Sequence, residues 1–106
     1  YEYVHDELGF NYRLPNLNAA LGCAQLEQLE HFVEVKREIA ARYAAFFAHQ
    51  PLRFVTEPAE CRSNYWLNAV LCEDRAERDA LLKNTNDQSV MTRPIWALMN
   101  RLPLFE

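Results

Sequence analysis

Apolar residues recur at spacings of three and four through the first half of the chain, over residues 16–49. This spacing is typical of an amphipathic helix. The apolar positions form two stripes, Leu17, Leu21, Ala24, Leu26, Leu29, Val33, Ala40, Tyr43 and Phe47 in the first, and Phe32, Val35, Ile39 and Phe46 in the second. A helix with two apolar stripes is covered on more than one side. The pattern therefore predicts one long helix, about 50 Å at ~1.5 Å per residue, that packs on something outside this segment.

The pattern changes after Gln50 and Pro51, because proline cannot continue a helix. Three runs predict strands. Two of them have the alternating pattern or the β-rich composition of strands, and the third is short. They are residues 52–55, residues 65–72 and residues 89–92. Asp74 with Glu77 three positions later has the spacing of a capping box and predicts a second helix ending near residues 84–87. We expect one or two further helical turns over residues 95–100.

This order of elements predicts an α+β fold, with a long N-terminal helix followed by a small antiparallel or mixed sheet and one or two further helices. A chain of 106 residues is near the commonest domain size. We therefore expect residues 1–106 to form a single domain. Trp66, near the start of the best strand pattern, is expected in the core.

Charge and composition exclude several classes of protein. The 15 acidic residues exceed the 11 basic ones, which argues against a nucleic-acid surface. No apolar run approaches the ~20 residues that a membrane span needs. The three cysteines, Cys23, Cys61 and Cys72, form no Cys-x-x-Cys pair, so we expect reduced thiols and a cytoplasmic protein. His5 lies near carboxylates, but no second histidine is at ligand spacing, and we expect no metal site.

A polar loop leads into the long helix. Gly9 permits a turn, and an amide and a guanidinium follow at Asn11 and Arg13. Proline disfavours helix in the residue before it, and asparagine is a preferred N-cap, so the helix is expected to begin at about Asn16, after Pro15. On local grounds alone, this is a turn that starts a helix.

Several short motifs, in order, carry a resemblance to a known family. They are Gly9-Phe10-Asn11-Tyr12-Arg13-Leu14, Ala19-Ala20-Leu21-Gly22, Gln25-Leu26-Glu27, Ser63-Asn64-Tyr65-Trp66-Leu67, Thr92-Arg93-Pro94-Ile95-Trp96 and Pro103. With these motifs the chain resembles the nucleotide-sugar aminotransferases of the DegT/DnrJ class, which are pyridoxal-phosphate enzymes of the aspartate-aminotransferase fold. The resemblance implies that the segment is part of the C-terminal small domain of a protein several times longer.

The resemblance also implies an activity and a set of site residues. Glutamate would donate an amino group, through pyridoxal phosphate, to a keto-sugar nucleotide in glycan precursor synthesis. Asn11 matches an asparagine that reaches across a homodimer to the cofactor phosphate of the other subunit, and Arg13 matches the neighbouring basic position. Arg93 and Trp96 match a segment that borders the sugar-nucleotide pocket, although many relatives have histidine at the position of Trp96.

The segment contains no expected catalytic residue. Transamination needs a lysine that forms a Schiff base with the cofactor. The chain has only Lys36 and Lys83, which have the character of surface lysines and match no family motif. The alternative interpretation is a non-enzymatic helical interaction or dimerisation module. A Ser-x-x-x-x-Lys segment about 50 residues before Tyr1, which the resemblance leads us to expect, would distinguish the two.

Overall fold

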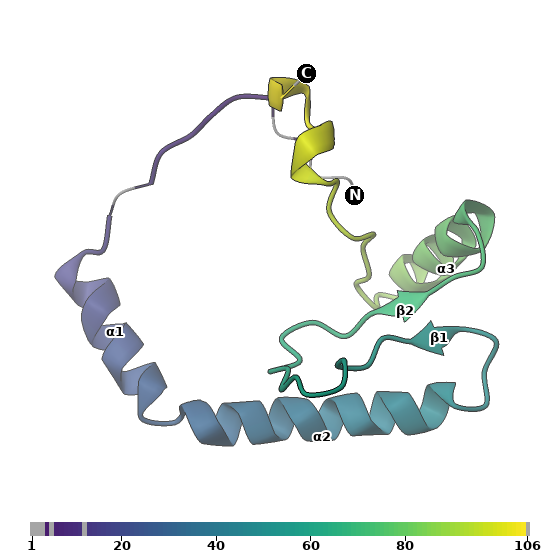
Figure 1. The fold of residues 1–106 in the computed structure, drawn as a ribbon, viewed down its shortest axis with the longest axis horizontal. Coiled ribbons are helices and arrows are strands. Elements are labelled where there is room, and N and C mark those ends of the chain that lie inside the picture. Colours follow the sequence, from purple (N-terminus) through teal and green to yellow (C-terminus); the bar gives the residue numbers. More distant parts are fainter. Residues whose placement is uncertain (1–3, 5, 12, 106) are drawn as a thin grey trace. The chain divides into compact units, whose positions relative to one another are not determined.

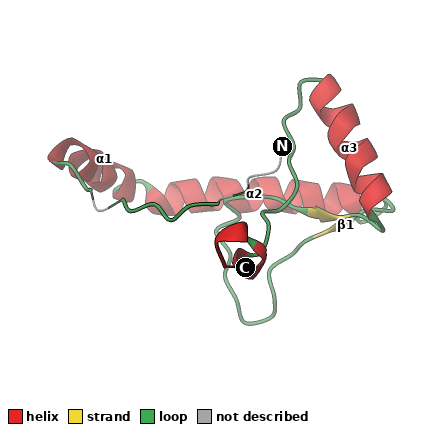
Figure 2. Ribbon diagram, turned by 90° about the horizontal axis from the view of Figure 1, so that it is seen from above, coloured by secondary structure: helices red, strands yellow, loops and turns green. Residues whose placement is uncertain are grey.

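The computed structural model describes residues 4, 6–11 and 13–105. Within them the chain forms helices, two short strands and two 3-10 turns (Figures 1 and 2). The elements are α1 (Asn16–Leu26), α2 (Leu29–Phe47), β1 (Arg53–Phe54), β2 (Val70–Leu71), α3 (Arg75–Asp87), η1 (Met99–Arg101) and η2 (Pro103–Phe105). The predicted α+β class is confirmed, and the sheet is antiparallel.

The chain divides into two compact units. The helix–sheet unit is Leu14–Cys72, which contains α1, α2 and both strands. The terminal unit combines Tyr1–Arg13 with Glu73–Glu106, which contains α3 and the 3-10 turns. The expectation of a single domain over residues 1–106 stays a prediction.

The prediction of one long helix over residues 16–49 is wrong, because the helix breaks at Glu27 and Gln28. The Gln28 N–H donates to the carbonyl of Gln25, three residues back, at 3.2 Å. This is the tighter bonding that closes a helix end. Gln28 has φ −113° and ψ 7°, outside the helical region, and α2 begins at the next residue. Neither residue at the break is a helix breaker by propensity, so the sequence held no local signal for it.

The start of α1 also differs from the prediction by one residue. Pro15, with φ −56° and ψ 149°, occupies the capping position, and no side chain caps the helix. The Pro15 carbonyl accepts the bond from the Ala19 N–H at 3.0 Å. Asn16 is therefore the first helical residue and not the N-cap. Proline serves here because it needs no N–H partner of its own at a helix entrance.

The core of the helix–sheet unit lies between α2 and β1. Ala40 on α2 is buried, at 3% exposure, and its small side chain allows close approach. Further along the helix, the rings of Tyr43 and Phe47 stack on Phe54 of β1, with centroids 6.1 and 6.2 Å away. Phe54 in turn pairs with Val70 across the antiparallel sheet. The last residues of the first apolar stripe, Tyr43 and Phe47, thus pack against β1.

The second stripe remains largely exposed among the described residues. Phe32, Val35 and Ile39 on α2 are between 37% and 39% exposed, and Phe46 is 61% exposed. Leucines of α1 and the start of α2 are also exposed: Leu17, Leu21, Leu26 and Leu29. The helices α1 and α2 therefore carry more apolar surface than the helix–sheet unit itself covers. No helix in the described part of the chain is long and apolar enough to span a membrane.

The predicted strand over residues 65–72 is only partly confirmed. Of residues 65–72, only Val70–Leu71 is a strand. The preceding backbone is committed to turns, since Ser63 Oγ accepts from the Tyr65 N–H and Asn64 Oδ1 accepts from the Trp66 N–H, both at 3.0 Å. Such local side-chain bonds compete with strand pairing. Trp66 is 66% exposed, so its expected place in the core is wrong.

The helix α3 has both ends well defined. Asp74 is its N-cap and accepts from the Glu77 N–H at 2.8 Å, while Glu77 accepts from the Glu73 N–H at 2.6 Å. The predicted N-cap at Asp74 is confirmed, whereas Glu77 bonds the residue before the cap and not the N–H of the cap itself. At the C-terminal end, Ser89 has φ 63°. Its N–H and that of Val90 donate to carbonyls of the last turn, at 3.0 and 2.9 Å, in the pattern of a Schellman motif.

This helix end explains why the predicted strand over residues 89–92 is wrong. The backbone there bonds back to α3, and none of these described residues joins a sheet. The predicted turn of helix over residues 95–100 appears later than expected, as η1 followed by η2. Leu102, between the two 3-10 turns, is 7% exposed and is the buried apolar residue of the terminal unit.

Candidate functional site

The residues expected to contact a cofactor, Asn11 and Arg13, lie in the loop that precedes α1. Both are exposed. Gly9 is open, because no heavy atom would lie within 4 Å of an added Cβ. Phe10 is 71% exposed, and Tyr12, which belongs to the same motif, lies outside the described residues. The Asn11 amide and the Arg13 guanidinium are thus both exposed on this loop.

The residues expected to border a substrate, Arg93 and Trp96, follow α3 in the terminal unit. Trp96 is 48% exposed. Arg93 is exposed, and its Nη2 lies 3.3 Å from Met91 Sδ. Asn11, Arg13, Arg93 and Trp96 all belong to the terminal unit. The expectation that they serve a cofactor and a substrate stays a prediction.

A cluster that sequence reasoning missed joins α2 to the loop before β2. Arg37 donates through both terminal nitrogens to Glu57, at 2.9 and 2.7 Å. It also donates to the Ser63 carbonyl at 2.6 Å. Its guanidinium lies 5.6 Å from the centre of the Tyr65 ring. A guanidinium is suited to such a site because its planar fork matches a carboxylate with two parallel bonds.

Glu57 is the acceptor at the centre of this cluster. Besides the two bonds from Arg37, one of its oxygens accepts from the Ser63 N–H at 2.6 Å. The Glu57 N–H donates to the Tyr65 hydroxyl at 3.0 Å. The bonds from Arg37 and then from the Ser63 amide stabilise the carboxylate and lower the pKa of Glu57 from 4.5 to about 2. The same carboxylate raises the pKa of Arg37.

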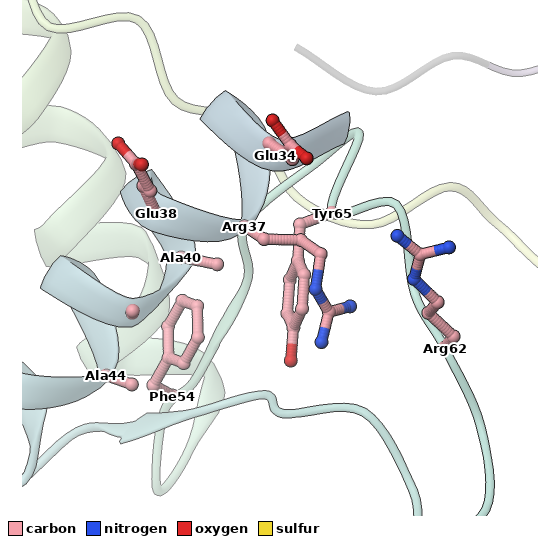
Figure 3. A pocket seen from close by; sticks show the side chains of 9 residues that line it. Glu34, Arg37, Glu38, Ala40, Ala44, Phe54, Arg62 and Tyr65 are labelled. Carbon is pink, nitrogen blue, oxygen red and sulfur yellow. The ribbon is translucent and has the colours of Figure 1, made fainter. Parts of the chain in front are cut away.

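An open groove lies beside this cluster in the helix–sheet unit. Its volume is about 550 Å³, and side chains of α2, β1 and the loop before β2 line it. Figure 3 shows the Arg37 guanidinium beside the Tyr65 ring, with Phe54 near Ala44. Arg37 is already engaged by Glu57 and Ser63. The cluster therefore holds the loop of Ser63 and Tyr65 against α2. Those two residues belong to one of the motifs that carry the family resemblance.

The two lysines of the chain both lie on helices. Lys36 is exposed on α2, and Lys83 is 77% exposed and paired with Asp87 on the surface of α3. Asn11 and Arg13 lie in an exposed loop, and their expected role toward a cofactor phosphate stays a prediction. Among the described residues, no group of three or more His, Cys, Asp and Glu side chains is placed to hold a metal ion.

Comparison with known proteins defines the class. Residues 1–106 match the DegT/DnrJ/EryC1/StrS aminotransferase family. The chain is 34% identical over 104 residues to GDP-perosamine synthase of Escherichia coli O157:H7, and 33% identical over 106 residues to that of Vibrio cholerae. It is 35% identical over 105 residues to the putative pyridoxal phosphate-dependent aminotransferase EpsN of Bacillus subtilis strain 168. No solved structure gives a significant match.

These similarities cover 98% of this chain and 28%, 29% and 27% of the three relatives in that order. The chain belongs to the DegT/DnrJ/EryC1/StrS aminotransferase family and spans little more than a quarter of the length of the relatives that it matches. The family resemblance stated from the motifs is thereby confirmed. Family membership favours an aminotransferase over a non-enzymatic helical module.

Proposed function

We propose that this chain is part of a pyridoxal-phosphate-dependent aminotransferase that transfers an amino group from glutamate to a keto-sugar nucleotide. The observation that supports the proposal is the family match over residues 1–106. Two of the relatives are GDP-perosamine synthases, and a third is a putative pyridoxal phosphate-dependent aminotransferase. Such an enzyme acts in glycan precursor synthesis.

The cofactor, when bound, supplies an electron sink that stabilises the carbanion formed at the amino-group carbon. Within this chain, Asn11 is proposed to donate an N–H to the cofactor phosphate of the partner in a homodimer. Arg13 supplies a charge beside it, since guanidinium groups pair well with phosphate. Arg93 and Trp96 border the sugar-nucleotide pocket. The exposed position of the Asn11 loop supports a role toward another chain.

The isolated 106 residues are proposed to be inactive. Lys36 and Lys83 are exposed on α2 and α3, and neither matches the lysine motif of the family. The Schiff-base lysine is therefore assigned to a part of the enzyme outside this segment. After mixing with pyridoxal phosphate and desalting, the segment should show no cofactor absorbance. A stoichiometric lysine adduct that survives competition by a free amine would contradict this.

Replacement of Asn11 by alanine in the full-length enzyme tests the proposed function. A neutral amide adds a donor to a phosphate without adding a charge that must be desolvated. Asn11→Ala should weaken cofactor retention by roughly 1–3 kcal/mol, the cost of losing a hydrogen bond to a charged group. The measurement is the cofactor dissociation constant by absorbance titration, with the dimer checked by light scattering, and dimerisation should change little.

The matched control is Asn18→Ala, which removes an exposed amide from α1 and should leave cofactor retention unchanged. Equal cofactor retention in the wild type and in Asn11→Ala would overturn the assignment of Asn11. A structure of the full dimer gives a second test. If the Asn11 amide points into its own subunit, with no partner phosphate in reach, the loop is only a helix start.

A further inference from the structure

The segment that follows α3 is held to the end of that helix by side-chain hydrogen bonds. Asn86 Nδ2 donates to the Leu82 carbonyl of its own helix at 2.7 Å, and to Thr92 Oγ1 and the Thr92 carbonyl, both at 3.1 Å. The hydroxyls of Thr85 and Thr92 lie 2.5 Å apart. All three side chains are partly buried. We call Thr85, Asn86 and Thr92 the threonine–asparagine anchor.

The directions of these bonds follow from the other partners of each group. The Thr85 hydroxyl uses its single proton toward carbonyls of its own helix, Leu81 at 2.8 Å and Leu82 at 3.2 Å. The Thr92 hydroxyl must therefore donate to Thr85 and accept from Asn86. The hydroxyls of Thr85 and Thr92 then each both donate and accept a hydrogen bond. Such a satisfied network specifies one arrangement of the chain.

The anchor ends at the residue before Arg93. On the other side of Arg93, Pro94 has a fixed φ and also restricts the backbone of the residue that precedes it. The Schellman bonds from Ser89 and Val90 fix the start of the same segment. The backbone that carries Arg93 is therefore constrained from both sides, whereas its side chain is exposed. Constraint of this backbone limits the directions in which the Arg93 side chain can extend.

We propose that Thr85, Asn86 and Thr92 are positioning residues that hold Arg93 toward the diphosphate group of a nucleotide-sugar substrate. The inference rests on the proposed function, which places Arg93 at the border of that substrate's pocket. A guanidinium recognises phosphate oxygens in a directional, bidentate way, so its orientation matters more than that of a point charge. The anchor residues themselves do not touch the substrate.

The test is steady-state kinetics of the full-length enzyme with Thr92→Val and Thr92→Ser. Valine keeps the shape of threonine and removes the hydroxyl, whereas serine keeps the hydroxyl. Thr92→Val should raise KM for the keto-sugar nucleotide about tenfold, within the range for a displaced binding group. KM for the amino donor should stay within twofold, and Thr92→Ser should behave as the wild type. Equal KM values in Thr92→Val and the wild type would overturn the inference.

A double-mutant cycle separates the anchor from Arg93 itself. If the anchor acts through Arg93, Thr92→Val should have no further effect on KM in an Arg93→Ala background. A full effect in that background would overturn the inference. Should Arg93→Ala alone leave KM for the sugar nucleotide unchanged, then the proposed role of Arg93 fails, and the inference fails with it. Should Arg93→Ala raise KM while Thr92→Val does not, only the anchor fails.

A second variant tests whether the expected rise in KM could come from a general loss of folding. Asn86→Ala removes the amide donor but leaves the two hydroxyls, and it should raise KM for the sugar nucleotide in the same direction. Asn84→Ala is the matched control, because Asn84 is an exposed residue of the same helix end that bonds Gln88 at 2.9 Å. Both variants are compared by thermal unfolding. A rise in KM with Asn84→Ala as large as with Asn86→Ala would contradict the proposal.

Discussion

At the scale of single residues, the ionised carboxylate of Glu57 holds the loop of Ser63 and Tyr65 against α2. Its carboxylate accepts from Arg37 and from the Ser63 amide, and these bonds lower the pKa of Glu57 from 4.5 to about 2. A carboxylate with a lowered pKa in the folded state adds stability above its unfolded pKa. That stability is lost as the pH falls from about 4.5 toward 2. The loop of Ser63 and Tyr65 should therefore loosen in acid.

The prediction is made for Glu57→Gln, which keeps the shape and removes the charge. In the intact protein the variant should unfold at a lower temperature than the wild type at pH 7. The gap between the two unfolding midpoints should narrow as the pH falls below about 4.5, because the wild type loses the same carboxylate. Glu60→Gln, at an exposed position nearby, is the control. A gap that stays constant with pH would contradict a role for the ionised carboxylate.

At the scale of elements, α3 shows that a helix can end on a residue that is not the usual choice. Ser89 occupies the left-handed position of the Schellman motif, with φ 63°. Glycine is preferred there because a side chain with a Cβ costs ~1–2 kcal/mol in that conformation. The motif persists because Val90 and Ser89 donate to carbonyls of the last turn and the anchor holds Thr92 beyond it. The helix end thus carries local strain.

Ser89→Gly should relieve this strain. We expect the free energy of unfolding to rise by roughly 0.5–1 kcal/mol. The relief of backbone strain at this position exceeds the extra conformational entropy that glycine has in the unfolded chain. Chemical denaturation of the intact protein measures the change. Ser89→Ala, which keeps the Cβ and removes only the hydroxyl, should show no such gain. An equal gain in both variants would mean that the hydroxyl, and not the backbone, was responsible.

At the scale of the whole molecule, the described chain exposes an unusual amount of apolar side chain. Of the large hydrophobic residues on α1 and α2, Leu26 is 66% exposed, Leu29 46% and Phe32 37%. Ala40 and Leu102 are the buried hydrophobic residues of the described part. Exposed apolar surface on this scale is typical of a protein interface. In the full-length enzyme we expect this surface to be covered.

Separated from the rest of the enzyme, the segment should therefore self-associate. We predict a dimer or larger species whose contact includes some of Leu26, Leu29, Phe32 and Val33, measured by light scattering over a range of concentrations. The double variant Leu26→Gln with Phe32→Gln should shift the distribution toward monomer. Leu98→Gln, which changes a residue that is 60% exposed in the terminal unit, is the control. A strict monomer at high concentration would contradict the prediction.

The sequence alone determined the features that depend on neighbouring residues. The cap of α3 could be predicted because Asp74 and Glu77 are three residues apart and bond to each other directly. The α+β class and the family could be stated for the same reason, since periodicity and short motifs are local. The site residues Asn11, Arg13, Arg93 and Trp96 came from the motifs, and their roles remain predictions.

Only the tertiary structure decided the features that join distant residues. Arg37 and Glu57 are 20 positions apart, and no spacing rule pairs them before α2 and the loop are folded together. The break at Gln28 and the turns at Tyr65 and Trp66 overrode residues that favour helix or strand. The bond from Asn86 to Thr92 requires a chain reversal at Ser89, a serine where glycine would have signalled the turn. Local propensity predicts where elements form, whereas the contacts that join them depend on the folded arrangement.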